Sequence, residues 1–89
     1  TELAPDRAEA ILTRGRSFGE SRNVCNVHWY TDVLAGRLVG AAAVAKLHAN
    51  EQFRQAMEAA RADIERMRRE GKSPQIDCAA EAKALSTGL

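Results

Sequence analysis

The chain has 89 residues, 13 of them basic and 12 acidic, which gives a net charge of +1. This length is enough for one small domain, spanning 1–89, and no more. Because charges of both signs are interspersed, the composition gives no reason to expect nucleic acid or an anionic membrane surface as a partner. Thr1 rather than a methionine begins the sequence, and we interpret this start as that of a processed or truncated product.

Residues 5–19 are predicted to form the first helix. Pro5 suits the first helical position, and Asp6 favours the positive end of the helix dipole. Apolar and small residues with helical spacing form one buried stripe: Ala8, Ile11, Leu12, Gly15, Phe18 and Gly19. Gly19 is expected to end the helix. A short extended or turn segment is expected to follow through Asn26, a residue that tolerates left-handed backbone geometry.

Residues 28–49 are predicted to form the central helix. Between Val33 and Leu47 only Arg37 and Lys46 are charged. A helix that is apolar almost all round is expected to be buried between other elements. We expect no membrane span here, because charges interrupt the apolar run and the run is too short.

Asn50 is predicted to cap a third helix over 51–70, which Gly71 ends. One narrow apolar stripe on this helix is interpreted as core: Phe53, Met57, Ala60, Ile64 and Met67. The Ser-Pro pair at 73–74 is expected to start a short last helix that runs to about Leu85. The predicted fold is therefore all-α, a small bundle of about four helices, and it would be marginally stable without a staple or a partner.

The segment between the first two helices carries the candidate site. His28 and Asp32 are four residues apart, so on a helix they share one face and the carboxylate can reach the imidazole. Arg22 is expected to enter from the turn before the helix, aimed at the same point. An arginine fork beside a histidine that a carboxylate orients suits an oxyanion, with phosphate as the first choice.

Other interpretations of these residues stay open at this point. Taken without their surroundings, His28 and Asp32 are most often a surface pair at a helix start, and Arg22 a surface ion-pair residue. A metal site built on His28 and Asp32 would lack a third and a fourth ligand. We therefore expect neither a metal ion nor a cofactor.

The spacing of Ser21, Arg22, His28 and Asp32 resembles the third signature motif of the type 2 phosphatidic acid phosphatase and vanadium haloperoxidase superfamily. Four flanking segments resemble the bacterial class A non-specific acid phosphatases: Gly-Arg-Ser-Phe-Gly-Glu at 15–20, His-Trp at 28–29, Ala-Gly-Arg-Leu-Val-Gly at 35–40 and Leu-His-Ala-Asn at 47–50. The similarity runs from about Pro5 to the end of the third helix, and more loosely beyond.

This resemblance implies a role for each motif residue in cleaving phosphomonoesters. His28 would attack phosphorus and form a phosphohistidine, while Asp32 would hold the other ring nitrogen. Arg22 would bind the phosphoryl oxygens. Ser21 would support the turn geometry. The family's mechanism uses no metal ion, and vanadate should bind in place of phosphate. The family resemblance also implies a periplasmic or secreted protein.

Two earlier motifs of the family do not occur in this sequence. One supplies a lysine and an arginine that bind phosphate, and the other is a Pro-Ser-Gly-His segment whose histidine protonates the leaving group. The only other histidine, His48, lies about 30 Å from His28 if one helix carries both. The sequence is therefore interpreted as the C-terminal portion of a larger helical phosphatase fold, with the missing N-terminal part as its partner.

Two further questions stay open from the residues alone. Cys25 and Cys78 suit one disulfide, which would be worth on the order of 4 kcal/mol and indicate an oxidising compartment, but two free buried thiols are equally compatible. The alternative function is a non-catalytic helical interaction module. In that case the apolar stripes would pair with another chain, such as a second copy in a homo-oligomer.

Overall fold

The computed structural model describes residues 1–86, and the regular secondary structure in that range is all helical. A short 3-10 turn, η1, precedes four α-helices: η1 Pro5–Arg7, α1 Ala8–Val24, α2 Tyr30–Leu47, α3 Glu51–Arg69 and α4 Cys78–Leu85. The prediction of an all-α fold with four helices is confirmed. Within the described range no helix is both long enough and apolar enough to cross a bilayer.

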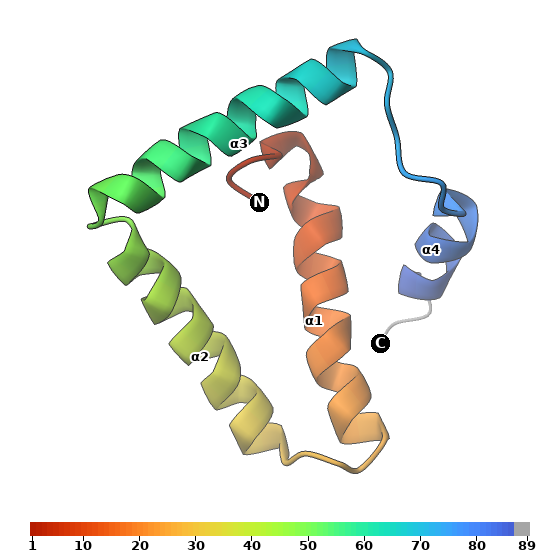
Figure 1. Cartoon of the computed structure of the whole chain (residues 1–89). Coiled ribbons are helices and arrows are strands. Elements are labelled where there is room, and N and C mark those ends of the chain that lie inside the picture. Colours follow the sequence, from red (N-terminus) through yellow and green to blue (C-terminus); the bar gives the residue numbers. More distant parts are fainter. Residues whose placement is uncertain (87–89) are drawn as a thin grey trace.

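The helices form an open, flat arrangement. α1 and α2 make a V that closes at the turn between them, α3 lies across the open end near the N-terminus, and α4 lies on the other side of α1 (Figure 1). The extents are 41 × 36 × 18 Å and the radius of gyration is 15.9 Å, compared with about 12 Å for a compact domain of this length. Because few helix faces meet, the chain is more extended than a closed bundle.

The predicted burial of the central helix is wrong for this chain. None of the residues that the structure describes is buried, and Leu38 and Val39 on α2 are 67% and 68% exposed. α2 packs chiefly against α1, so most of its apolar surface faces outward. The stripe on α3 is not a core either, since Phe53, Met57 and Ile64 are only half-buried.

The first helix does not end at Gly19 as predicted, and it continues to Val24. It ends where Asn26 adopts a left-handed φ of 56°. Val27 N–H donates to the Arg22 carbonyl at 3.1 Å and Asn26 N–H donates to that of Asn23 at 3.0 Å. This pair of bonds is a Schellman motif. Asn26 thus supplies the left-handed residue, as its type predicts.

Gly19 is required for the approach of α1 to α2 rather than for a helix end. A Cβ atom on Gly19 would lie 2.8 Å from Val33 Cγ1 and 3.2 Å from Arg37 Nη2. Val33 is β-branched and has little rotamer freedom to move away in a helix. The two helices therefore meet closely at this residue.

A pair of alanine substitutions tests this close approach. Gly15→Ala is expected to stabilise the chain by about 0.5–1 kcal/mol, because alanine is the better helix former and open space surrounds its Cβ position. Gly19→Ala is expected to be about 1–3 kcal/mol less stable than Gly15→Ala, because its Cβ overlaps Val33. Urea unfolding followed by circular dichroism measures both, and equal stabilities for the two variants would contradict the close approach.

The ends of α3 agree with the sequence. The Asn50 side chain accepts a hydrogen bond from Phe53 N–H at 3.0 Å, as expected of an N-cap. Gly71 follows the helix with a φ of +69°, a value that favours glycine. The N-terminal segment is tied to α3 and to the C-cap residue of α2, since Asp6 pairs with Arg68 at 3.1 Å and Glu2 pairs with His48 at 2.9 Å.

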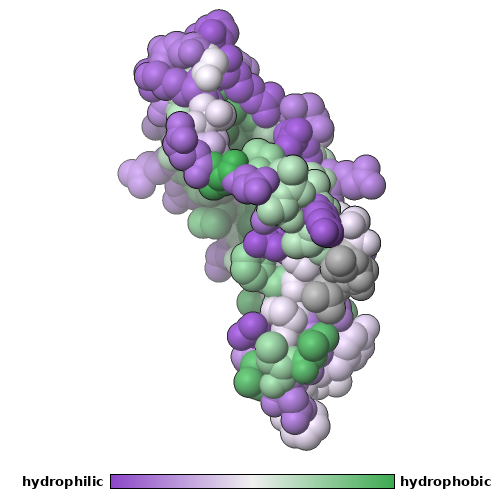
Figure 2. All heavy atoms as spheres, turned by 90° about the vertical axis from the view of Figure 1, so that its right-hand side faces the viewer, coloured by the Kyte–Doolittle hydropathy of each residue, from purple (hydrophilic) through white to green (hydrophobic). Residues whose placement is uncertain are grey.

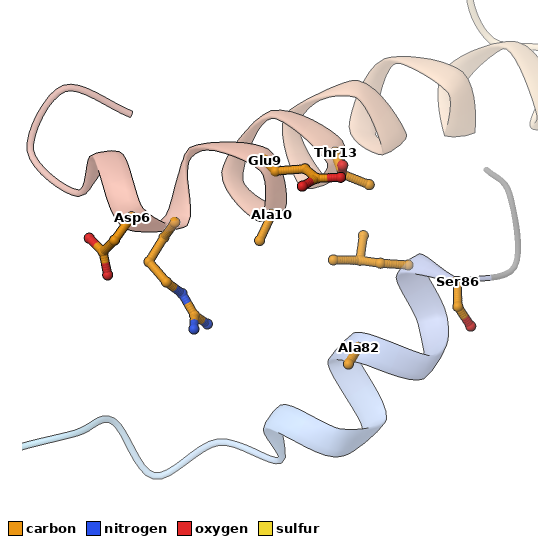
Figure 3. Close-up of a pocket in the computed structure, with 8 residues that line it drawn as sticks. Asp6, Glu9, Ala10, Thr13, Ala82 and Ser86 are labelled. Carbon is orange, nitrogen blue, oxygen red and sulfur yellow. The ribbon is translucent and has the colours of Figure 1, made fainter.

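The last helix begins later than the Ser-Pro pair at 73–74 predicts. Asp77 is its N-cap, and the Asp77 side chain accepts from Ala80 N–H at 2.9 Å. α4 packs on α1 through an ion pair of 2.9 Å between Glu81 and Arg14. Figure 3 shows the shallow pocket that these two helices leave between them. Because a capping carboxylate satisfies helix N–H groups directly, Asp77 sets the start instead of the proline.

Cys25 and Cys78 are both free and exposed. The possible disulfide is therefore absent, and the alternative of two free thiols is correct except that neither thiol is buried. Cys25 caps the end of α1, whereas α4, which starts at Cys78, pairs with Arg14 in the middle of α1. Arg14 and Cys25 are roughly 16 Å apart along the helix axis. The helix packing thus brings the two thiols to different regions of the molecule.

Candidate functional site

Arg22, His28 and Asp32 line one shallow concavity of about 320 Å³ between α1 and α2. The structure therefore brings together the three side chains that the sequence singled out. The other residues that line it come from both helices: Gly15, Gly19, Val33, Gly36 and Arg37. Open space surrounds the Cβ positions of Gly15 and Gly36, whereas Gly19 lies against Val33.

The contact between His28 and Asp32 is present, although its geometry differs from the prediction. His28 precedes Trp29, the N-cap of α2, so the histidine lies before the helix and not on its face. Its Nδ1 lies 2.9 Å from Asp32 Oδ1. Asp32 Oδ2 accepts a hydrogen bond of 2.9 Å from Trp29 N–H. One carboxylate thus fixes both the imidazole and the first turn of the helix.

This contact decides which ring nitrogen is available. A carboxylate only accepts hydrogen bonds, so in a neutral imidazole Nδ1 must carry the proton and Nε2 the lone pair. Within residues 1–86 the hydrogen bonds of the His28 ring go to Asp32 alone. The His28 side chain is also 53% exposed. Nε2 is therefore accessible as a nucleophile or as a proton acceptor.

Arg22 approaches the site from the last turn of α1, not from the turn before α2. Its Nε donates to Ser21 Oγ at 3.2 Å, and that hydroxyl donates to the Phe18 carbonyl at 2.8 Å. Ser21 therefore orients the guanidinium group. The described residues give the terminal nitrogens of Arg22 no ion-pair partner, so they are available to an anion.

Arg37 is a residue of this concavity that sequence reasoning missed. Its Nη2 lies 2.6 Å from Glu20 Oε1 and donates to the Arg16 carbonyl at 3.4 Å. The signal was present in the sequence, because Arg37 lies four residues after Val33 and is one of only two charged residues between Val33 and Leu47. That spacing places Val33 and Arg37 on one face, and both side chains lie against Gly19 of α1.

Comparison with known proteins shows that the chain is similar to one class of enzyme. The chain is 45% identical to an acid phosphatase of Zymomonas mobilis over 73 residues, which are 82% of this chain and 28% of the relative. It is 36% identical to a non-specific acid phosphatase of Providencia stuartii over 69 residues, 78% of this chain and 28% of the relative. A non-specific acid phosphatase of Salmonella typhimurium is 39% identical over 64 residues, 72% of this chain and 26% of that protein.

The resemblance to bacterial non-specific acid phosphatases is confirmed. The chain spans about a quarter of the length of these acid phosphatases, which is consistent with a C-terminal portion. No family model matches the chain, and no solved structure matches it either.

Proposed function

We propose that this chain carries the nucleophile part of an acid phosphatase site, which hydrolyses phosphomonoesters through a phosphohistidine at His28. One observation supports this role most directly. Asp32 holds Nδ1 at 2.9 Å, which leaves Nε2 without a hydrogen-bond partner among residues 1–86, and His28 and Arg22 line the same concavity. Phosphoryl transfer requires a nucleophile that is oriented by a second group. It also requires a nearby cation that can bind the phosphoryl oxygens.

In the first step Nε2 attacks phosphorus, and the ester P–O bond breaks. The Nδ1 proton stays on the ring, so the phosphorylated imidazole is cationic and the Asp32 carboxylate stabilises it. Arg22 binds the equatorial phosphoryl oxygens, whose charge must be held in the transition state. Water then attacks phosphorus, the P–N bond breaks, and phosphate leaves with His28 restored.

The leaving alkoxide needs a proton that this chain does not supply. His48, the other histidine, pairs with Glu2 at the far end of α2, which is about 27 Å long. We therefore assign the proton donor to the missing N-terminal part of the enzyme. The same group, once deprotonated, takes the proton of the attacking water.

Exposed apolar surface supports a partner of this kind. Figure 2 shows hydrophilic surface gathered at the end of the molecule where α3 lies, and apolar patches toward the opposite end. At that opposite end Val24 and Val27 are 68% and 61% exposed, and Trp29 is 80% exposed. A group of exposed apolar side chains beside a site indicates a surface that another protein segment covers. A periplasmic or secreted location is part of the proposal on family resemblance alone.

The isolated chain is expected to show no appreciable turnover of p-nitrophenyl phosphate, because it lacks the proton donor. It is still expected to bind vanadate, with nuclear magnetic resonance shifts at His28 and Arg22, because the nucleophile and one oxyanion ligand are present. Robust turnover by the chain alone would contradict the division of the site between two parts. Self-association without any vanadate binding would favour the interaction module instead.

A further inference from the structure

Arg37 holds the two helices of the site together. In the described part of the chain, the hydrogen bonds and ion pairs that join α1 to α2 all come from this residue, which contacts Glu20 Oε1 at 2.6 Å and the Arg16 carbonyl at 3.4 Å. The side chains of Arg37 and Glu20 are 37% and 33% exposed, the lowest pair of values among the ion pairs of residues 1–86. This pair is thus better shielded from solvent than the other ion pairs.

The position of this contact matters for the site. Glu20 lies two residues before Arg22 on α1, whereas Arg37 is on the same helix as Asp32. No described residue is buried, so the angle between the helices has no packed core to fix it. A rotation about the turn that joins them would separate the Arg22 guanidinium group from the imidazole of His28.

We propose that Arg37 is a positioning residue of the phosphate site. By tying α2 to α1 through Glu20, it holds the guanidinium group of Arg22 at a fixed distance from the His28–Asp32 pair. This inference rests on the proposed function, because it takes Arg22 and His28 as the two sides of an oxyanion site. Binding of a tetrahedral anion requires both sides at once, so a loss of the tie weakens binding without removing either ligand.

The test makes two measurements on the 89-residue chain. The first is its affinity for vanadate, and the second is the nuclear magnetic resonance signal of the Arg22 Nε–H group without vanadate. Arg37→Met is expected to lower the affinity by about tenfold, the loss typical of one charge-assisted contact. Glu20→Gln is the decisive variant. It removes a negative charge near the site, so a purely electrostatic role of this pair predicts tighter anion binding. The positioning role predicts weaker binding and a shifted Arg22 signal.

Two further variants serve as controls. The first is a double variant that combines Glu20→Arg with Arg37→Glu. It restores the ion pair with its charges reversed, so it is expected to recover most of the affinity for vanadate. Arg66→Met removes an arginine that pairs with Asp63 on α3 at 3.0 Å, and it is expected to change neither measurement. Circular dichroism checks that all variants keep the helix content of the unaltered chain.

The outcomes separate this inference from the proposed function. If Glu20→Gln binds vanadate as tightly as the unaltered chain or more tightly, with Arg22 unshifted, the positioning role is overturned and the proposed function stands. If the unaltered chain does not bind vanadate, the proposed function fails. In that case the Arg22 signal still decides whether Arg37 positions that side chain, because this signal is recorded without any ligand.

Discussion

Replacing His28 with alanine is expected to reduce phosphatase turnover by on the order of 10³-fold or more, because removing a nucleophile abolishes the covalent route. The measurement needs a complete site. A suitable protein is the Zymomonas mobilis acid phosphatase in which this chain replaces the matching segment, where the two are 45% identical over 73 residues. Turnover of p-nitrophenyl phosphate is then compared with and without His28→Ala.

His48→Ala is the matched control for this experiment. It removes the other histidine of the chain, whose contacts go to Glu2 and to the ring of Phe53. It is expected to leave turnover within about twofold, the usual range for a surface substitution. Retained activity in His28→Ala would refute the assignment of the nucleophile. An unaltered chimera that folds but has no activity would contradict the proposal that this chain carries a working part of the site.

Asp32→Asn is expected to lower turnover by about 10²–10⁴-fold in the same chimera, for a reason that lies in the tautomer of the imidazole. The carboxylate uses one oxygen for His28 Nδ1 and the other for Trp29 N–H. An amide has one oxygen and one NH2 group. If its oxygen keeps the bond to the backbone, the NH2 group faces Nδ1 and forces the proton onto Nε2, the atom that must attack.

Asp63→Asn on α3 is the control for this variant. Its carboxylate pairs with Arg66 at 3.0 Å and is 62% exposed, so the change is expected to have no measurable effect on turnover. The histidine ring signals of the isolated chain report the tautomer directly, and Asp32→Asn is expected to move the proton of His28 to Nε2. Full activity of Asp32→Asn would show that the carboxylate does not set the tautomer.

Features that depend on neighbouring residues were predictable from the sequence. Asn50 caps α3 through a bond to Phe53, and Gly71 ends that helix with a positive φ. The contact between His28 and Asp32 spans four residues and was predicted on the same ground, although His28 lies before the helix. In each case the interacting groups are close in the chain, so the residue types and their spacing are enough.

Features that depend on which helices pack against each other were not predictable from the sequence. Gly19 has the residue type of a helix end, but the structure uses it for the approach of Val33 on another helix. The apolar α2 predicts burial, yet burial requires a partner surface, and residues 1–86 provide such a surface chiefly through α1. Pairing of Cys25 with Cys78 failed for the same reason, since it depends on how α4 lies along α1.

The sequence by itself determined the helical class, the caps of α3 and the choice of Arg22, His28 and Asp32 as candidate site residues, because these follow from short-range hydrogen bonds and from spacing. Only the tertiary structure decided that Arg22 reaches the site from α1 and that Arg37 ties the two helices through Glu20. That tie joins residues 17 positions apart. Its formation depends on the angle between two helices, and no local pattern in the sequence specifies that angle.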